Sequence, residues 1–179
     1  RKSSADMKLT PSDALSGVVR STVDTAHGKV QFRSAGMAPK VTHVLLHGIG
    51  SASASWAFQL GAAVGRSDIR VLAWDAPGYG RSTHLPMDCP SAQDYAERLW
   101  SWLDALYVNE PVVLAGHSLG ALMAASATRL RLPPDRVPIF AVGSKCKRCN
   151  VSSTLCSQPQ PSSDSIWLCN ASRSPMQLL

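Results

Sequence analysis

Short apolar runs that alternate with helical patterns constrain the fold of this chain more than any other feature of its sequence. The runs have the length of buried strands: Val41 to Leu46, Ile69 to Trp74, Val112 to Ala115 and Val137 to Val142. Apolar residues recur at helical spacing over Ser55 to Val64, Ser91 to Tyr107 and Leu119 to Leu130. This alternation is typical of βαβ units, so we expect an α/β fold in which helices flank parallel strands.

An antiparallel hairpin is expected ahead of the parallel strands. Val18 to Thr25 and Val30 to Ser34 are its strands, and Ala26-His27-Gly28-Lys29 connects them. The length of 179 residues suits one domain. We place that domain at residues 17–143, after a flexible leader at 1–16 and before an irregular tail at 144–179 that is rich in Ser, Cys and Pro.

Charge and hydropathy argue against two classes of partner. The formal net charge is +6, but Lys and Arg are scattered over the domain without interleaved aromatic residues, so we expect no nucleic-acid partner. No apolar run approaches the ~20 residues that span a bilayer, so we expect no membrane partner. No signal peptide is visible over Arg1 to Lys8, although the chain does not begin with Met and its true start stays open. The oligomeric state is not predicted.

Cysteine is distributed unevenly along the chain. Cys89 is the only cysteine before residue 144, which is typical of a reduced, cytoplasmic protein. The tail holds Cys146, Cys149, Cys156 and Cys169. Its C-x-x-C has the spacing of half a zinc site, but a second pair at matching spacing and any His are absent from the tail. We therefore expect an unpacked tail and no metal.

The strongest functional signal is Gly116-His117-Ser118-Leu119-Gly120, between a predicted strand and a predicted helix. A G-x-S-x-G stretch in that context turns the backbone sharply and exposes the serine hydroxyl. Gly116 and Gly120 are needed because side chains there would collide with the strand or the helix. The helix start at Leu119 offers unpaired N–H groups that suit an oxyanion. Ser118 is thus the predicted nucleophile, and a purely structural turn is the alternative.

Two loops after predicted strands complete the expected site. His47-Gly48-Ile49-Gly50 follows the first parallel strand, and its backbone N–H can reach a reacting carbonyl oxygen. We expect Ile49 to be the second oxyanion donor beside Leu119, with Gly50 as the next candidate, and His47 to orient this backbone. The loop that starts at Asp75 and ends at Ser82 is expected to be structural, with Asp75 and Arg81 pairing or bonding backbone.

In combination these stretches resemble the α/β-hydrolase family over roughly residues 26–143. The shared order is a strand with an HG loop, a strand with a DxPGxGxS loop, and a strand that leads through GHSLG into a helix. The resemblance implies an α/β-hydrolase fold that is incomplete in this chain. Serine at 118 argues against the epoxide hydrolase and haloalkane dehalogenase branches, which have Asp there. The loops look most like the enol-lactonase, esterase and carbon–carbon-bond hydrolase group.

In this family an acid and then a catalytic His follow the nucleophile along the chain. None of the five histidines of this chain follows Ser118; they are His27, His43, His47, His84 and His117. Asp135 lies too early to be the acid, and Asp164 lies in the tail. His117 and His47 are the alternatives for the base. His27 and His84 are expected to be solvated, and His43 to be a packed strand residue.

We therefore expect a hydrolase of carboxylic esters, lactones or related acyl compounds, with a small-molecule substrate and no cofactor, that is inactive as this fragment. One alternative is a noncatalytic binding protein of the same fold or a degenerate gene product. A further alternative is an acyltransferase, in which the serine passes its acyl group to an acceptor other than water.

Overall fold

The computed structural model describes residues 10–131 and 139–142. Within these residues six strands form one sheet in the order β1-β2-β4-β3-β5-β6. They are β1 (Val19–Thr25), β2 (Gly28–Ala35), β3 (His43–Leu46), β4 (Val71–Trp74), β5 (Val113–His117) and β6 (Ile139–Val142). The helices are α1 (Pro11–Ala14), the 3-10 turn η1 (Ser53–Trp56), α2 (Ala57–Ala63), α3 (Ala92–Ala105) and α4 (Leu119–Leu130). None of these described helices is long and apolar enough to cross a membrane.

The sheet confirms the predicted hairpin followed by parallel strands. β2 is antiparallel to both β1 and β4, whereas β4, β3, β5 and β6 run parallel. The hairpin loop is shorter than predicted: Thr25 pairs with Gly28, so only Ala26 and His27 connect the strands. Gly28 has a φ of +104°, and a Cβ there would lie 2.6 Å from the Thr83 hydroxyl oxygen. Glycine at this position therefore allows the tight turn.

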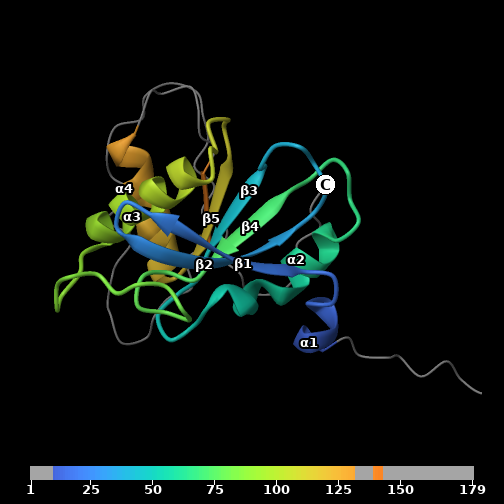
Figure 1. The fold of residues 1–179 in the computed structure, drawn as a ribbon, viewed down its shortest axis with the longest axis horizontal. Coiled ribbons are helices and arrows are strands. Elements are labelled where there is room, and N and C mark those ends of the chain that lie inside the picture. The colour runs from blue at the N-terminus through green and yellow to red at the C-terminus, as the bar shows by residue number, and fades with distance from the viewer. Residues whose placement is uncertain (1–9, 132–138, 143–179) are drawn as a thin grey trace, which may run out of the picture.

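Helices cover both faces of the sheet (Figure 1). α3 and α4 pack together on one face, and α1, η1 and α2 lie on the other. On the α3 face the Trp102 ring contacts the rings of Phe32 and Trp74. On the other face Leu60 packs into a smaller apolar cluster. Strands β3 and β4 are almost fully buried from both sides, which explains why their sequences are continuous apolar runs.

Helix α1 is an element that the sequence analysis did not predict. Thr10 and Asp13 cap it reciprocally, and Ala14 is buried. A Cβ added to Gly61 of α2 would lie 2.5 Å from the carbonyl oxygen of Ala14, so the two helices are in close contact. Residues 10–16 thus pack onto the domain, although a flexible leader was expected over 1–16. Residues 1–9 and the tail at 144–179, with its Cys146–Cys149 pair, lie outside the described residues.

Candidate active site

Ser118 lies at a sharp reversal of the backbone. β5 ends at His117 and α4 begins at Leu119, so Ser118 alone joins the strand to the helix. Its φ of 56° and ψ of −118° lie in a region that residues with a Cβ rarely adopt. Such a conformation costs on the order of 1–3 kcal/mol and persists only where the surrounding structure enforces it. The turn therefore has the geometry that the five-residue pattern predicts.

The side chain of Ser118 is not used by the fold around it. The residue is half-buried, and its hydroxyl does not cap α4. Among the described residues it forms no side-chain hydrogen bond. Because Ser118 is the N-cap, the N–H groups of Leu119 and Gly120 belong to the first helical turn, whose amides lack partners within the helix. A serine hydroxyl and backbone N–H donors thus occur together at one helix start.

Two glycines let the helix start pack against the strand ends. A Cβ at Gly116 would lie 2.2 Å from the carbonyl oxygen of Gly120. A Cβ at Gly120 would lie 2.1 Å from the carbonyl oxygen of Leu46, at the end of β3. Both distances are far below any real carbon–oxygen contact, so side chains at either position would force the backbone apart.

The loop after β3 lies directly beside Ser118. Leu46 pairs with Gly116 in the parallel register, and a Cβ at Gly48 would lie 3.1 Å from the Cβ of Ser118. The next residue, Ile49, is 74% exposed, and Gly50 has a φ of +70°. The sheet therefore brings together the two segments that the sequence analysis assigned to one site.

His47 joins this loop to the one after β4. The imidazole is only 1% exposed; its Nδ1 lies 2.8 Å from the carbonyl oxygen of Gly48, and its Nε2 lies 3.0 Å from the backbone N–H nitrogen of Ala76. An amide can only donate, so Nε2 accepts and the ring is neutral, with its proton on Nδ1. Burial lowers the pKa of His47, against smaller opposing effects of the Gly48 carbonyl and Asp75. Because both nitrogens are engaged, His47 is poorly placed to act as the base.

A buried polar chain fixes the far end of the same loop. Asp75 Oδ1 accepts the backbone N–H of Ser53 at 2.7 Å, and the Ser53 hydroxyl accepts a hydrogen bond from Arg33 Nη1. Asp75 and Ser53 are almost completely buried, and Arg33 is 9% exposed. Asp75 thus forms a hydrogen bond with the backbone, which confirms one of the two roles expected for it. Arg81 is exposed and takes part in no ion pair within the described residues.

Ser53 and Arg33 were not singled out from the sequence. Arg33 follows Val30, Gln31 and Phe32, and a charged residue inside a predicted strand is a signal that could have identified it. Ser53 carries no comparable signal, because serine is common in loops and its partners lie 20 and 22 residues away.

The remaining histidines do not assemble a second site. His27 and His84 are exposed, as expected, and His43 is half-buried with its Nδ1 2.9 Å from the Thr42 hydroxyl oxygen. His117 is exposed at the end of β5. Within the part of the chain that the structure describes, no group of three or more His, Cys, Asp or Glu residues could hold a metal ion.

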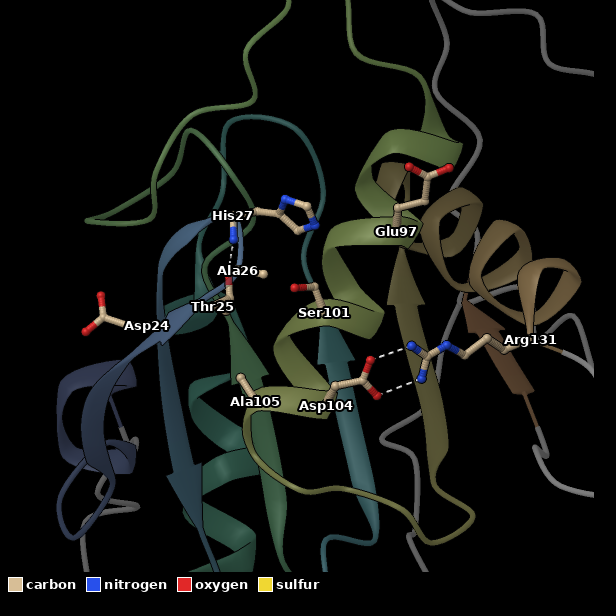
Figure 2. Close-up of a pocket in the computed structure, with 9 residues that line it drawn as sticks. All are labelled: Asp24, Thr25, Ala26, His27, Glu97, Ser101, Asp104, Ala105 and Arg131. Carbon is tan, nitrogen blue, oxygen red and sulfur yellow. Dashed lines mark hydrogen bonds and ion pairs between the residues drawn. The ribbon is translucent and has the colours of Figure 1, made fainter.

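An open cleft of about 440 Å³ lies elsewhere, between the hairpin loop and α3 (Figure 2). Its lining includes His27, Glu97, Asp104 and Arg131, of which the last two form an ion pair. No residue of the Ser118 turn or of the HG loop lines it. Arg131 follows the C-terminal end of α4, about 20 Å along the helix from Ser118. The cleft is therefore separate from the candidate site.

Known proteins resemble this chain in sequence and in structure. The model of the Alpha/beta hydrolase family matches residues 44–173. Protein phosphatase methylesterase 1 of Mus musculus is 32% identical over 94 residues, which are 51% of this chain and 24% of the relative. (E)-2-((N-methylformamido)methylene)succinate hydrolase of Acinetobacter baylyi is 34% identical over 99 residues, which are 55% of this chain and 35% of the relative.

Solved structures show the same architecture. An epoxide hydrolase from an endophytic Streptomyces is 30% identical and superposes with a TM-score of 0.57 over 70% of this chain and 38% of that protein. The present chain thus spans about a quarter to two fifths of the length of these similar proteins.

Proposed function

This chain belongs to the alpha/beta hydrolase family, and on that premise we propose that it carries the nucleophile of a serine hydrolase acting on carboxylic esters, lactones or related acyl compounds. The observation that carries the proposal is the backbone at Ser118. A residue with a Cβ is held at a positive φ between β5 and α4, and its hydroxyl has no structural hydrogen bond among the described residues. Strain of this kind is typical of a reacting residue.

In the proposed reaction the Ser118 hydroxyl attacks the substrate carbonyl carbon. The carbonyl oxygen becomes an oxyanion, and the N–H groups of Leu119 and Ile49 stabilise it. A preorganised donor of this kind is typically worth about 10²–10³ in rate. The attack needs a base to take the hydroxyl proton, and no His follows Ser118 in this chain. Collapse of the tetrahedral adduct would break the bond to the leaving alcohol, which takes up a proton, and water would then cleave the acyl–Ser118 ester and release the acid.

The polar residues behind the loop serve to position it. His47 holds the carbonyl of Gly48, and Asp75 holds the N–H of Ser53, so the loop that contains Ile49 is fixed at both ends. Gly48 permits the close approach to Ser118, and Gly50 permits the turn after Ile49. Residues 17–143 form the proposed catalytic domain.

The serine at position 118 and the names of two of the three similar proteins support acyl chemistry over epoxide chemistry. The mouse relative is by name a methylesterase, and the Acinetobacter relative is a hydrolase of a succinate derivative. The epoxide hydrolase branch is expected to have an Asp at the nucleophile position, where this chain has Ser118. We propose a small-molecule acyl substrate on this basis.

A fluorophosphonate probe tests the assignment of the nucleophile. The full 179-residue chain is incubated with the probe in the presence of imidazole, which replaces the absent base, and the labelled peptide is identified by mass spectrometry. We expect labelling at Ser118 at least about tenfold faster than at Ser126, a partly exposed serine of α4 that serves as an internal reference. Ser118→Ala should abolish the fast labelling, and Ser126→Ala should leave it unchanged. Equal labelling of the two serines in a folded chain would refute the proposal.

A noncatalytic binding protein of the same fold is the second candidate, because both ring nitrogens of the neighbouring His47 are already engaged in hydrogen bonds. In that case the site would bind an acyl compound while Ser118 stays unreactive. Binding of an ester by calorimetry, together with failure of the probe reaction at Ser118, would select this alternative.

A further inference from the structure

Strand β1 forms an open edge of the sheet. It pairs with β2 on one side, and within the described residues no strand pairs with its other side. Arg20, Thr22 and Asp24 are exposed, whereas Ser21, Val23 and Thr25 are half-buried. Val23 packs on the apolar cluster of the α3 face. An open edge of this length is a template for another strand, and natural proteins usually block it.

The hydrogen bonds of β2 show which groups of β1 face outward. The N–H groups of Lys29 and Gln31 donate to the hydroxyls of Thr83 and Ser82, at 2.9 Å each, and the Gln31 carbonyl accepts the N–H of Asp75. These groups point away from β1, so the pairs Asp24–Lys29 and Thr22–Gln31 are the non-hydrogen-bonded pairs of the hairpin.

It follows that Thr22 and Asp24 direct their N–H and C=O groups to the open edge. Arg20 does the same, because it lies two residues before Thr22 and strand geometry repeats every two residues. Six backbone groups on three consecutive outward-facing residues are therefore free to pair with a further strand.

The charges on this edge are self-complementary. Arg20 and Asp24 stand two residues on either side of Thr22, and both are exposed. Within the described residues neither has an ion-pair partner. Figure 2 shows Asp24 pointing away from the residues of the cleft near α3. Arg20 also lies opposite Arg33 of β2, so a negative charge beside it would relieve repulsion between two cations.

We propose that β1 pairs antiparallel with β1 of a second copy of this chain, about a two-fold axis at Thr22. This pairing places Arg20 of each copy opposite Asp24 of the other and joins the two sheets into one. Parallel, in-register pairing would place like charges opposite each other, which is unfavourable. Because the two copies use the same surface, the assembly closes at a dimer.

The dimer is expected to be weak. Its contact is one short strand from each copy, which lies at the small end of specific interfaces, and its two ion pairs are exposed to solvent. We therefore expect a reversible equilibrium, with dissociation in the micromolar range or weaker.

Sedimentation velocity of the full chain over a range of concentrations tests the proposal. The wild type should shift from monomer to dimer as concentration rises. Arg20→Asp or Asp24→Arg alone should raise the dissociation constant about tenfold, because each places like charges at two symmetric positions. The double variant, Arg20→Asp with Asp24→Arg, should restore association to within about threefold of wild type.

Two further variants separate this edge from other modes of association. Asp88→Arg makes the same change of charge as Asp24→Arg, but at an exposed loop position, and should leave the monomer–dimer equilibrium unchanged. Thr22→Pro removes the central outward N–H and should abolish dimerisation, while circular dichroism checks that the chain stays folded. A chain that stays monomeric throughout would overturn the proposal, as would association that ignores the charge at residues 20 and 24.

Discussion

At the scale of single residues, the candidate site depends on groups whose chemical state is fixed by burial. His47 is the clearest case, because one of its nitrogens must accept a hydrogen bond from the Ala76 amide. A second proton on the ring would face that amide N–H with no acceptor between them. The residue proposed to orient the oxyanion loop is thus also one that must stay neutral.

This requirement predicts that acid destabilises the fold through His47. Burial lowers the pKa of His47 in the folded chain, so the unfolded chain binds a proton at higher pH than the folded chain does. The associated stability is complete above the unfolded pKa of about 6.5 and falls as the pH drops below it. Urea unfolding from pH 8 to pH 5 should show this loss in the wild type.

The matched variant is His47→Gln, which should be less stable at pH 8 but should lose less stability on acidification. The pKa of His43 is also lowered by burial and by Arg66, so part of the pH dependence should remain in the variant. Identical slopes for the two proteins between pH 6.5 and 5 would show that His47 does not titrate as argued.

Residue types predicted much of this site because their constraints are local. Gly116, Ser118 and Gly120 restrict one turn of backbone, and that turn is present. The link from Arg33 through Ser53 to Asp75 was not predicted, because it depends on which strands become neighbours. β2 lies beside β4 only in the folded sheet, and no spacing along the chain encodes that adjacency.

At the scale of elements, loops after two parallel strands are tied together by buried polar contacts. The apolar runs predicted the strands, because burial on both faces demands them. The 3-10 turn at Ser53–Trp56 and the short helix α1 were missed, because a tertiary hydrogen bond holds the first and a capping box holds the second, and neither shows as periodicity. The Asp75 contact to Ser53 is what anchors η1 to the end of β4.

A double-mutant cycle measures this link between β2, η1 and the loop after β4. Asp75→Asn keeps an acceptor for the Ser53 amide but leaves the buried Arg33 without a counter-charge, and should cost about 1–3 kcal/mol in urea unfolding. Adding Arg33→Met should recover part of that loss, with a coupling energy of about 1 kcal/mol or more.

The exposed pair of Asp104 and Arg131 provides the control for this cycle. Asp104→Asn should cost about 1 kcal/mol or less, because solvent screens the pair. Strictly additive effects of the Asp75 and Arg33 substitutions would mean that the two residues do not act through Ser53 as one unit.

At the scale of the whole molecule, the sheet places Ser118 and the backbone N–H groups proposed as donors at the carboxyl ends of β3 and β5, where open parallel sheets bind ligands. The order of strands therefore explains why the site forms from segments about seventy residues apart. It does not supply a base, because no His follows Ser118 in this chain. Loss of the base from a serine hydrolase costs up to about 10⁶ in turnover.

We therefore expect the 179-residue chain to hydrolyse p-nitrophenyl acetate little or not at all in plain buffer, and to gain activity when imidazole is added as a diffusible base. Imidazole cleaves this ester by itself, so the rate measured with Ser118→Ala must be subtracted. The remaining rate should rise with imidazole concentration. Above neutral pH it should persist until the fold is lost, because the free base of imidazole is the active form. Turnover without imidazole that Ser118→Ala abolishes would show that a residue of this chain serves as base, with His117 the first to substitute. If the variant matches the wild type at every imidazole concentration, the reversal at Ser118 holds a serine that does not react.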